Sequence, residues 1–459
     1  MKFLRLFAAL PLCILGFSSA NLTAHDLTTP EQLYPQLDVI LKQAVAQSPR
    51  MIRRAADLEI AENDRIGARA GLLPSVGGYY AYYKSHDKQE LLYDNPANSS
   101  SQTYTLTKTP YALSIAQPLF YWGERKNSAK IGEINQSIAE GQYREGYRLL
   151  AQTLRGEYLR LIILKLSTER ARYYQAYASD QLKQDQDKLT KKVISEAEIF
   201  GTQVAADRAD IARDRAEADL DSALRSFNRL AGSGTNLTEA DIPANIPKIA
   251  ANDAGLEALM KGFLAQKDTA NPEAITLRKQ LEIENLNYKI SRTRLLPKVS
   301  LSAGLTQDEQ NNYFGQGARY SVNSAYAGVS LNWVLFDGFA AGAAQRNSLA
   351  RRRQLEGDYR QLTERLATDA GTQVKQIGFS VRSMAITERL LESSEGNLRV
   401  REEEHGRGVR SDSEVSLAKL GLYDAQLNAL SARREYLISV GDFLGLVVED
   451  PVLGNIPKQ

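Results

Sequence analysis

The segment RTRLLPKVSLSAGLTQ, residues 292–307, changes from one pattern to another within a few positions. Its first part is the charged end of a helix-like run, and after Leu-Leu-Pro apolar and polar residues alternate as in a strand. Proline ends a helix at this point because it biases the residue before it towards extended backbone. Residues 69–84, RAGLLPSVGGYYAYYK, repeat the arrangement. The sequence therefore predicts a helix-to-strand junction at Pro74 and another at Pro297.

The likeness between these two segments continues along the chain and indicates a tandem duplication. Matching residues lie 223, then 216, then 210 positions apart, and the separation changes only at a few points, as differences in loop length would produce. A unit of this length is too long for a solenoid repeat. We expect two structural repeats, residues 21–248 and 249–459. The matches include Pro49 with Pro272, PLF at 118–120 with VLF at 334–336, and NIPK at 245–248 with NIPK at 455–458.

Two long segments without proline predict the helices. Proline is absent from residues 119–242 and 298–450, which are rich in residues that favour helix. Between Tyr143 and Leu161, apolar residues recur every three or four positions and form a stripe on a polar rod. A helix from Tyr121 to about Lys191 would be about 100 Å long. We expect coiled-coil-like packing to bury such a stripe.

Strands are expected between the helices. In VSLSAGLT and GVSLNWVL, which begin at Val299 and Gly328, alternation gives each strand one apolar face. Aromatic residues near the strand ends are typical of a transmembrane β-barrel, although a soluble sheet packed on helices would show the same alternation. Four strands have open edges, which cannot lie in hydrocarbon, so transmembrane strands would need an oligomer that shares one barrel. The expected strands are about 75–87, 103–120, 298–309 and 321–336.

The first twenty residues have the pattern of a signal peptide. Lys2 and Arg5 precede an apolar run that ends at Phe17, and a small-residue site follows, with cleavage expected after Ala20. The alternative is a transmembrane anchor, but the run is shorter than the roughly 20 apolar residues that span a bilayer. A lipid anchor on Cys13, the chain's one cysteine, is disfavoured because a large leucine precedes it.

Composition argues against several functional classes. The chain has 57 Lys and Arg against 55 Asp and Glu, and loss of residues 1–20 leaves 55 of each sign, so it is not built to bind a polyanion. His25, His86 and His405 are scattered, and we find no Ser/His/Asp set, phosphate loop or ligand-spaced Cys/His cluster. The basic run 351–353 reads as a solvated helix face. We expect no enzyme activity, cofactor, metal or nucleic-acid partner.

The whole arrangement resembles the TolC-like outer-membrane efflux and type I secretion channel family, over about residues 30–450. The resemblance rests on the duplicated units and on three segments: AQPLFYWGERKNSA (116–129), NWVLFDGFAAGAAQ (332–345) and HGRGVRSDSEVSLAKLGLYDAQ (405–426). It implies a mixed, mainly α fold in which long helices form an α-barrel. Each chain would add four transmembrane strands to a 12-stranded β-barrel shared by a homotrimer.

The resemblance also implies a function and a location. The chain would be the exit duct of a tripartite efflux or type I secretion system, placed in the bacterial outer membrane and extending into the periplasm. Its partners would be outer-membrane lipid, a periplasmic adaptor (membrane fusion) protein and an inner-membrane transporter. The alternative is a periplasmic coiled-coil scaffold or adaptor that does not span a membrane. Such a protein has no need of apolar strand faces with flanking aromatics in both halves.

In this family, inward-packed helices close the periplasmic end of the channel. A glycine turn there is followed by an arginine and by carboxylates that form rings, and these positions are matched by Gly408, Arg410 and Glu414. The second carboxylate position is Leu417, which implies one ring of Glu414 beside an apolar ring. The counterpart of Glu414 in the first repeat is Glu198, which would accept a hydrogen bond from Arg410 across the gate.

The resemblance assigns two further sets of positions. The turns at about 192–198 and 406–414 would dock the adaptor, and the helix-strand junctions would lie near the membrane interface beside Trp122 and Trp333. The docking residues are Val193, Ser195, Gly408 and Ser411. The junction residues are Pro74, Pro118, Phe120, Pro297 and Phe336.

Overall fold

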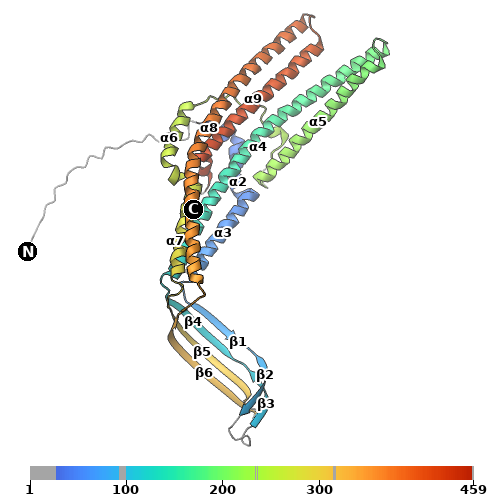
Figure 1. The fold of residues 1–459 in the computed structure, drawn as a ribbon. Coiled ribbons are helices and arrows are strands. Elements are labelled where there is room, and N and C mark those ends of the chain that lie inside the picture. The colour runs from blue at the N-terminus through green and yellow to red at the C-terminus, as the bar shows by residue number, and fades with distance from the viewer. Residues whose placement is uncertain (1–26, 92–99, 233, 235, 314–316, 457–459) are drawn as a thin grey trace, which may run out of the picture.

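Long helices and a sheet occupy opposite ends of an elongated molecule (Figure 1). The computed structural model describes residues 27–91, 100–232, 234, 236–313 and 317–456. The predicted signal peptide, residues 1–20, lies outside these residues, as does the end of the second NIPK segment. The expectation of a mainly helical fold with a sheet is confirmed. The division into repeats at residue 248 stays a prediction.

Two helical hairpins form the end of the molecule that is farthest from the sheet. In each, a helix of 67 residues turns back into a helix about half as long, and at 1.5 Å per residue the longer helix measures about 100 Å. The expected rod from Tyr121 to about Lys191 is therefore confirmed, although the helix begins three residues later and ends one residue earlier. The hairpins are α4 (Glu124–Thr190) with α5 (Glu196–Ala231), and α8 (Ala340–Gly406) with α9 (Asp412–Leu446).

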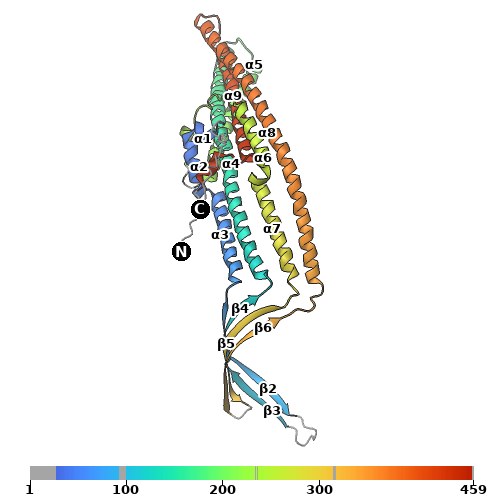
Figure 2. The ribbon, with the colours of Figure 1, turned by 90° about the vertical axis from the view of Figure 1, so that its left-hand side faces the viewer.

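The helices lie side by side in one curved layer (Figure 2). Near the sheet the order is α3 (Pro49–Ala70), α4, α7 (Pro272–Arg292) and α8, and away from the sheet it is α5, α4, α9 and α8. The matching prolines 49 and 272 each begin a helix, where the missing N–H costs nothing. Because α4 is central, α8 and the pair α3 and α5 form the two outer sides of the layer.

The described residues contain six strands, where the sequence analysis expected four. The reason is an interruption at Ala81-Tyr82 and Thr109-Pro110, since Pro110 has no N–H to donate to the ladder. The antiparallel register is unchanged across it: Tyr80 pairs with Tyr111 and Tyr83 with Lys108. The strands are β1 (Ser75–Tyr80), β2 (Tyr83–Leu91), β3 (Ser100–Lys108), β4 (Tyr111–Phe120), β5 (Lys298–Tyr313) and β6 (Ala318–Asn332).

The sheet therefore follows four chain paths, although it has six strands. β1 continues into β2 and β3 into β4, while β5 pairs with β4 along most of its length, with β3 near its end, and with β6 on its other side. The expected strand 321–336 is displaced, because β6 begins at Ala318 and ends at Asn332, and the residues after it form the junction to α8.

One face of the sheet is apolar and exposed in the single chain. Cross-strand partners share a face, and the pairs Val76–Ile115, Leu113–Leu305 and Leu301–Val329 all join apolar residues. The alternation expected from the sequence is thus confirmed. The apolar face comprises Val76, Tyr80, Leu113, Ile115, Leu301, Leu305, Val329 and Leu331, all exposed. Small and polar residues such as Ser114, Ser302, Gly304 and Ser330 occupy the opposite face.

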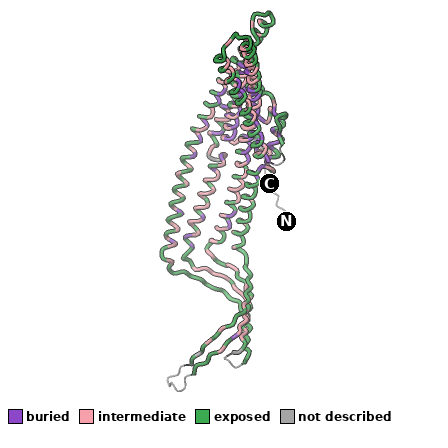
Figure 3. Tube along the Cα trace, turned by 90° about the vertical axis from the view of Figure 1, so that its right-hand side faces the viewer, coloured by how far each residue is buried: buried purple, intermediate pink, exposed green. Residues whose placement is uncertain are grey.

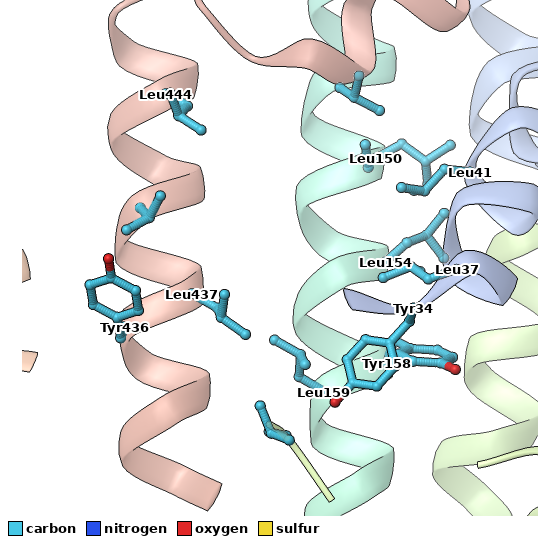
Figure 4. Packing of buried hydrophobic residues seen from close by; sticks show 14 of the residues in the cluster. Tyr34, Leu37, Leu41, Leu150, Leu154, Tyr158, Leu159, Tyr436, Leu437 and Leu444 are labelled. Atoms are coloured by element: carbon cyan, nitrogen blue, oxygen red, sulfur yellow. The ribbon is translucent and has the colours of Figure 1, made fainter. Parts of the chain in front are cut away.

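The hydrophobic core lies where short segments pack on the middle of the helical layer. Buried residues gather there, while the sheet and the hairpin ends are largely exposed (Figure 3). Side chains from α2 (Pro35–Gln47) pack on α4, as Leu41 does on Leu150 and Leu37 on Leu154 (Figure 4). The rings of Tyr34 and Tyr158 lie 5.4 Å apart. This core joins the beginning, middle and end of the chain.

Helices α1 (Pro30–Leu33) and α6 (Asp253–Ala270) and the 3₁₀ segments η3 (Glu239–Asp241) and η4 (Pro451–Asn455) complete the fold. Within the described residues, none of the helices carries a stretch apolar and long enough to cross a membrane.

Candidate functional site

The turns that join the helices of each hairpin have the same conformation. The amide of Val193 donates to the Lys188 carbonyl at 2.8 Å, and the amide of Val409 donates to the Glu404 carbonyl at 3.0 Å. In each turn the preceding residue is left-handed: Lys192 at φ 56° and its counterpart Gly408 at φ 74°. This is the Schellman ending of a helix. Val193 and Val409 are each 69% exposed at these tips.

The unequal residues at the left-handed position lead to a prediction. A side chain in this conformation costs about 1 kcal/mol, and glycine avoids that cost. We expect Lys192→Gly to stabilise the first turn, so that hydrogen exchange at the Val193 amide slows about fivefold. Gly408→Lys is the matched control and should speed exchange at Val409 by a similar factor. If neither substitution changed hydrogen exchange at the amide that follows it, the cost of the left-handed side chain would be contradicted.

A capping box follows each turn and positions one carboxylate. Ser195 begins α5 and donates its backbone N–H to Glu198 Oε2 at 2.7 Å, while Ser411 begins α9 and donates to Glu414 Oε2 at 3.1 Å. The serine hydroxyl and the third helical amide complete each box. The predicted docking residues Ser195 and Ser411 therefore act first as helix caps. The Ser-x-x-Glu spacing is a sequence signal for this role that our sequence analysis did not use.

The second turn also carries a network of charges. Arg410 Nη1 donates to Glu414 Oε1 at 2.7 Å, and Arg410 Nε donates to Glu404 Oε2 at 2.9 Å. The hydrogen bond from the Ser411 backbone N–H lowers the pKa of the Glu414 carboxyl most, and the hydrogen bond from Arg410 lowers it further. The Ser195 backbone bond lowers the pKa of Glu198 in the same way. Both carboxylates are therefore ionised at neutral pH.

The predicted contact of Arg410 with Glu198 does not occur within the described part of one chain. Arg410 forms ion pairs with Glu404 and Glu414 of its own hairpin, and Glu198 accepts hydrogen bonds from Ser195 in the first turn. A contact between these residues across neighbouring chains stays a prediction. Leu417 lies one helical turn beyond Glu414 and is exposed, and its counterpart in the first repeat is Gly201. The apolar position is thus a feature of the second repeat.

Contacts between α4 and α9 join the two hairpins below their tips. Tyr177 Oη and Ser413 Oγ lie 2.9 Å apart, and Arg170 Nε donates to Asp424 Oδ1 at 2.6 Å. The Lys419 ammonium lies 4.7 Å from the centre of the Tyr173 ring. These residues escaped the sequence analysis because more than 230 positions separate the members of each pair, and no local pattern marks them.

The helix-strand junctions are also built alike in the two halves. Pro74 and Pro297 immediately precede β1 and β5, as predicted. On the return path, two successive residues are left-handed in each half: Trp122 and Gly123 in the first, and Gly338 and Phe339 in the second. These pairs are separated by the same 216 positions as the turns.

Aromatic residues surround both junctions. Trp122 Nε1 donates to the Pro297 carbonyl at 2.7 Å, and Trp333 Nε1 donates to the Leu295 carbonyl at 3.0 Å. The β4–β5 register shifts between Pro118 and Phe120, so β4 bends there. Phe120 packs edge-on against Trp122, and Phe336 packs at 90° against Phe339. The exposed indole rings suit a boundary between water and lipid.

Metal-ligating side chains do not gather anywhere in the described residues, since no three of His, Cys, Asp or Glu are placed to hold an ion.

The sequence model of the outer membrane efflux protein family matches residues 40–233 and 271–442. The chain belongs to this family. The chain is accordingly an outer-membrane protein that extends into the periplasm, and its family is one of channels.

Individual relatives agree with this assignment. The chain is 24% identical over 289 residues to the nickel-cobalt-cadmium resistance protein NccC of Alcaligenes xylosoxydans xylosoxydans, a match over 61% of this chain and 59% of that relative. Its fold is similar to that of the Campylobacter jejuni outer membrane channel CmeC, with a TM-score of 0.66 at 12% identity over 90% of this chain and 86% of that one. For the outer membrane protein VceC of Vibrio cholerae the TM-score is 0.61 at 14% identity over 90% and 96%.

Proposed function

We propose that the efflux protein is the exit duct of a tripartite efflux or type I secretion system. It passively conducts substrate from an inner-membrane transporter and a periplasmic adaptor to the exterior. The observation that carries this proposal is the exposed apolar face of the sheet at one end of a helical layer about 100 Å long. A scaffold that stays in the periplasm would leave that face in water, which disfavours the alternative function.

The sheet supports assembly as a trimer. Among the described strands, β1 pairs only with β4 and β6 only with β5, so each chain has two open edges. An open edge cannot lie in hydrocarbon, because its N–H and C=O groups would have no partner. When β6 of one chain pairs with β1 of the next, three chains with four strand paths each close a barrel of 12 paths.

The outer helices support the same assembly. On α8, Phe379, Ile386 and Leu390 form an exposed apolar stripe beyond the level at which α7 begins, and α5, on the other side of the layer, exposes Phe200 and Ile211. These stripes are unpaired in the single chain. In a head-to-tail ring, α8 of one chain lies beside α3 and α5 of the next and buries both stripes.

This arrangement predicts that Ile386→Asp weakens the trimer. Burial of an isoleucine stabilises a contact by about 2 kcal/mol, and a carboxylate in its place would be desolvated without a partner. The single chain should still fold, because Ile386 is 59% exposed within it. We expect monomers in detergent by analytical ultracentrifugation, whereas Ile386→Leu remains trimeric. A trimeric Ile386→Asp protein would exclude this face from the interface.

The hairpin turns supply the gate and the docking surface in this proposal. Three copies of Glu414 form a ring of negative charge at the periplasmic end, and Leu417 forms an apolar ring beside it. The capping box and Arg410 support this role, since they hold the carboxylate in one place. The exposed Val193 and Val409 offer the adaptor a repeated apolar contact.

Single-channel conductance in a planar bilayer tests the function and the gate together. We expect a small, cation-selective conductance whose selectivity falls in Glu414→Gln. Asp412→Asn is the matched control, because Asp412 carries the same charge two positions earlier, is 88% exposed and lies 2.9 Å from His405 Nε2 rather than beside an arginine. A protein that does not enter the bilayer would contradict the duct. A conducting Glu414→Gln channel with full selectivity would place the gate elsewhere.

The pH dependence follows from the pKa of Glu414. Because the folded-state pKa lies below the ordinary value of 4.5, the carboxylate keeps its charge as pH falls towards that value and loses it only below it. We therefore expect cation selectivity to be the same at pH 7 and pH 5. Loss of selectivity between these values would show that another group, with a higher pKa, carries the charge.

A further inference from the structure

The apolar face of the sheet continues into a basic one. Because the register is unchanged across the interruption and side chains alternate, Lys84, His86 and Lys88 of β2 lie on the same face as Val76 and Tyr80 of β1. Their partners on β3 are Thr107, Thr105 and Thr103. We call these six residues the basic ladder. Exposed Tyr80 and Tyr111 form the end of the apolar face, and Tyr82 lies between them and the ladder.

The ladder is turned towards the surroundings of the molecule. Lys84, His86 and Lys88 are exposed, whereas on the other face of the same ribbon Leu106 is only 3% exposed and Asp87 is half-buried. The carboxylates of Asp87 and Asp308 both lie on that other face. At this level the outward face carries Lys84, Lys88 and Arg319 against Glu90 and Glu309, whereas the other face carries Lys108 against Asp87 and Asp308, so the outward face has the more positive balance of charge.

The two lysines of the ladder have capacity for a further ligand. His86 Nδ1 lies 3.2 Å from Thr105 Oγ1, and Lys88 pairs with the next outward residue, Glu90. Within the described residues, no ion pair involves Lys84. Ammonium and hydroxyl groups in this spacing donate hydrogen bonds to phosphate oxygens, which accept several at once. A phosphate placed against the ladder would meet two ammonium groups and a row of hydroxyl groups.

We propose that the basic ladder binds phosphate groups carried by lipids of the outer leaflet. The inference rests on the proposed function, because it places the apolar face in hydrocarbon. The tyrosines then lie at the interface, and the next outward residues meet the charged headgroups. Continuity with the apolar face favours a phosphate held in the membrane over a free ion, because the ladder begins where the lipid-facing surface ends.

The test uses the full-length trimer in nanodiscs of neutral phosphatidylcholine. Bisphosphorylated lipid A and its dephosphorylated form are titrated in turn, and bound lipid is counted by native mass spectrometry. We expect the wild type to prefer the phosphorylated lipid. In Lys84→Gln/Lys88→Gln, affinity for it should fall about fivefold for each lysine and about 25-fold in all. Lys84→Arg/Lys88→Arg should keep the preference, as should Lys108→Gln, which removes a charge from the opposite face.

Three outcomes would overturn the inference. Equal binding of the two lipids by the wild type would exclude phosphate recognition. An unchanged preference in the double glutamine variant would place the site elsewhere, and competition by excess inorganic phosphate would indicate a site for the free ion. Failure of the wild type to enter nanodiscs would instead contradict the proposed function. An inserted trimer that ignores phosphate leaves that function intact, so the two failures are distinguishable.

Discussion

Replacement of Arg155 by methionine is expected to lower the free energy of unfolding by about 3–5 kcal/mol. Arg155 of α4 is 3% exposed and donates to both oxygens of Asp450, at 2.8 and 2.9 Å, and to Glu31 Oε2 at 2.8 Å. Burial by itself would lower the pKa of Arg155, but the hydrogen bonds and charges of Asp450 and Glu31 raise it. The guanidinium thus joins α1, α4 and the C-terminal segment.

The cost arises from the carboxylates that remain. Asp450 is 1% exposed, so without Arg155 its charge would be buried without compensation. Urea unfolding followed by circular dichroism measures the change. Arg160→Met is the control: Arg160 is exposed and pairs with Glu157 at 3.3 Å, so its loss should cost less than about 0.5 kcal/mol.

A second variant separates the ion pairs from packing. Glu31→Gln/Arg155→Met/Asp450→Asn removes all three charges together, and we expect it to regain most of the stability lost in Arg155→Met. If Arg155→Met were as stable as Arg160→Met, this cluster would not hold the ends of the chain to α4.

Replacement of Leu305 by arginine is expected to prevent stable insertion in the membrane. Leu305 lies on the apolar face between Leu113 and Ala325, and an arginine on the lipid side near the bilayer centre costs about 2–4 kcal/mol per chain. In the proposed trimer this cost would arise three times. Extraction of membranes with urea measures insertion: the wild type should stay with the membrane, and Leu305→Arg should be released.

The adjacent residue provides the control. Thr306 pairs with Ala112 and Ser324 on the opposite face, which would line the interior of the barrel. Thr306→Arg places the same charge one residue away but towards water, so insertion should be retained. Release of both variants, or retention of both, would contradict the assignment of the two faces.

Much of this fold could be predicted from local patterns. The prolines at 74 and 297 predict the ends of α3 and α7, the proline-free segments predict α4 and α8, and period-two alternation predicts the apolar face. The interruption at Pro110 had a visible signal, a proline within a strand pattern, that the four-strand expectation overlooked. The capping serines were likewise visible in the Ser-x-x-Glu spacing at 195–198 and 411–414.

The long-range contacts of the buried core and of the candidate site could not be predicted in this way. Arg155 meets Asp450 across 295 positions, and Arg170 meets Asp424 across 254. A charged residue on a long helix has the same local pattern whether it is solvated or buried against a distant partner. The resemblance to a family predicts Glu414 at the gate, but only the structure shows that Ser411 and Arg410 hold its carboxylate.

The sequence by itself determined the duplication, the long helices, the junction prolines and the two-faced strands, because each depends on backbone preferences and periodicity within a few turns. Only the tertiary structure decided which charges are buried, how the hairpins join, and that the face of Val76 continues into the basic ladder. Those features depend on the register between strands and on the packing of segments far apart in the chain. Such contacts stabilise the protein only once the segments that make them have come together.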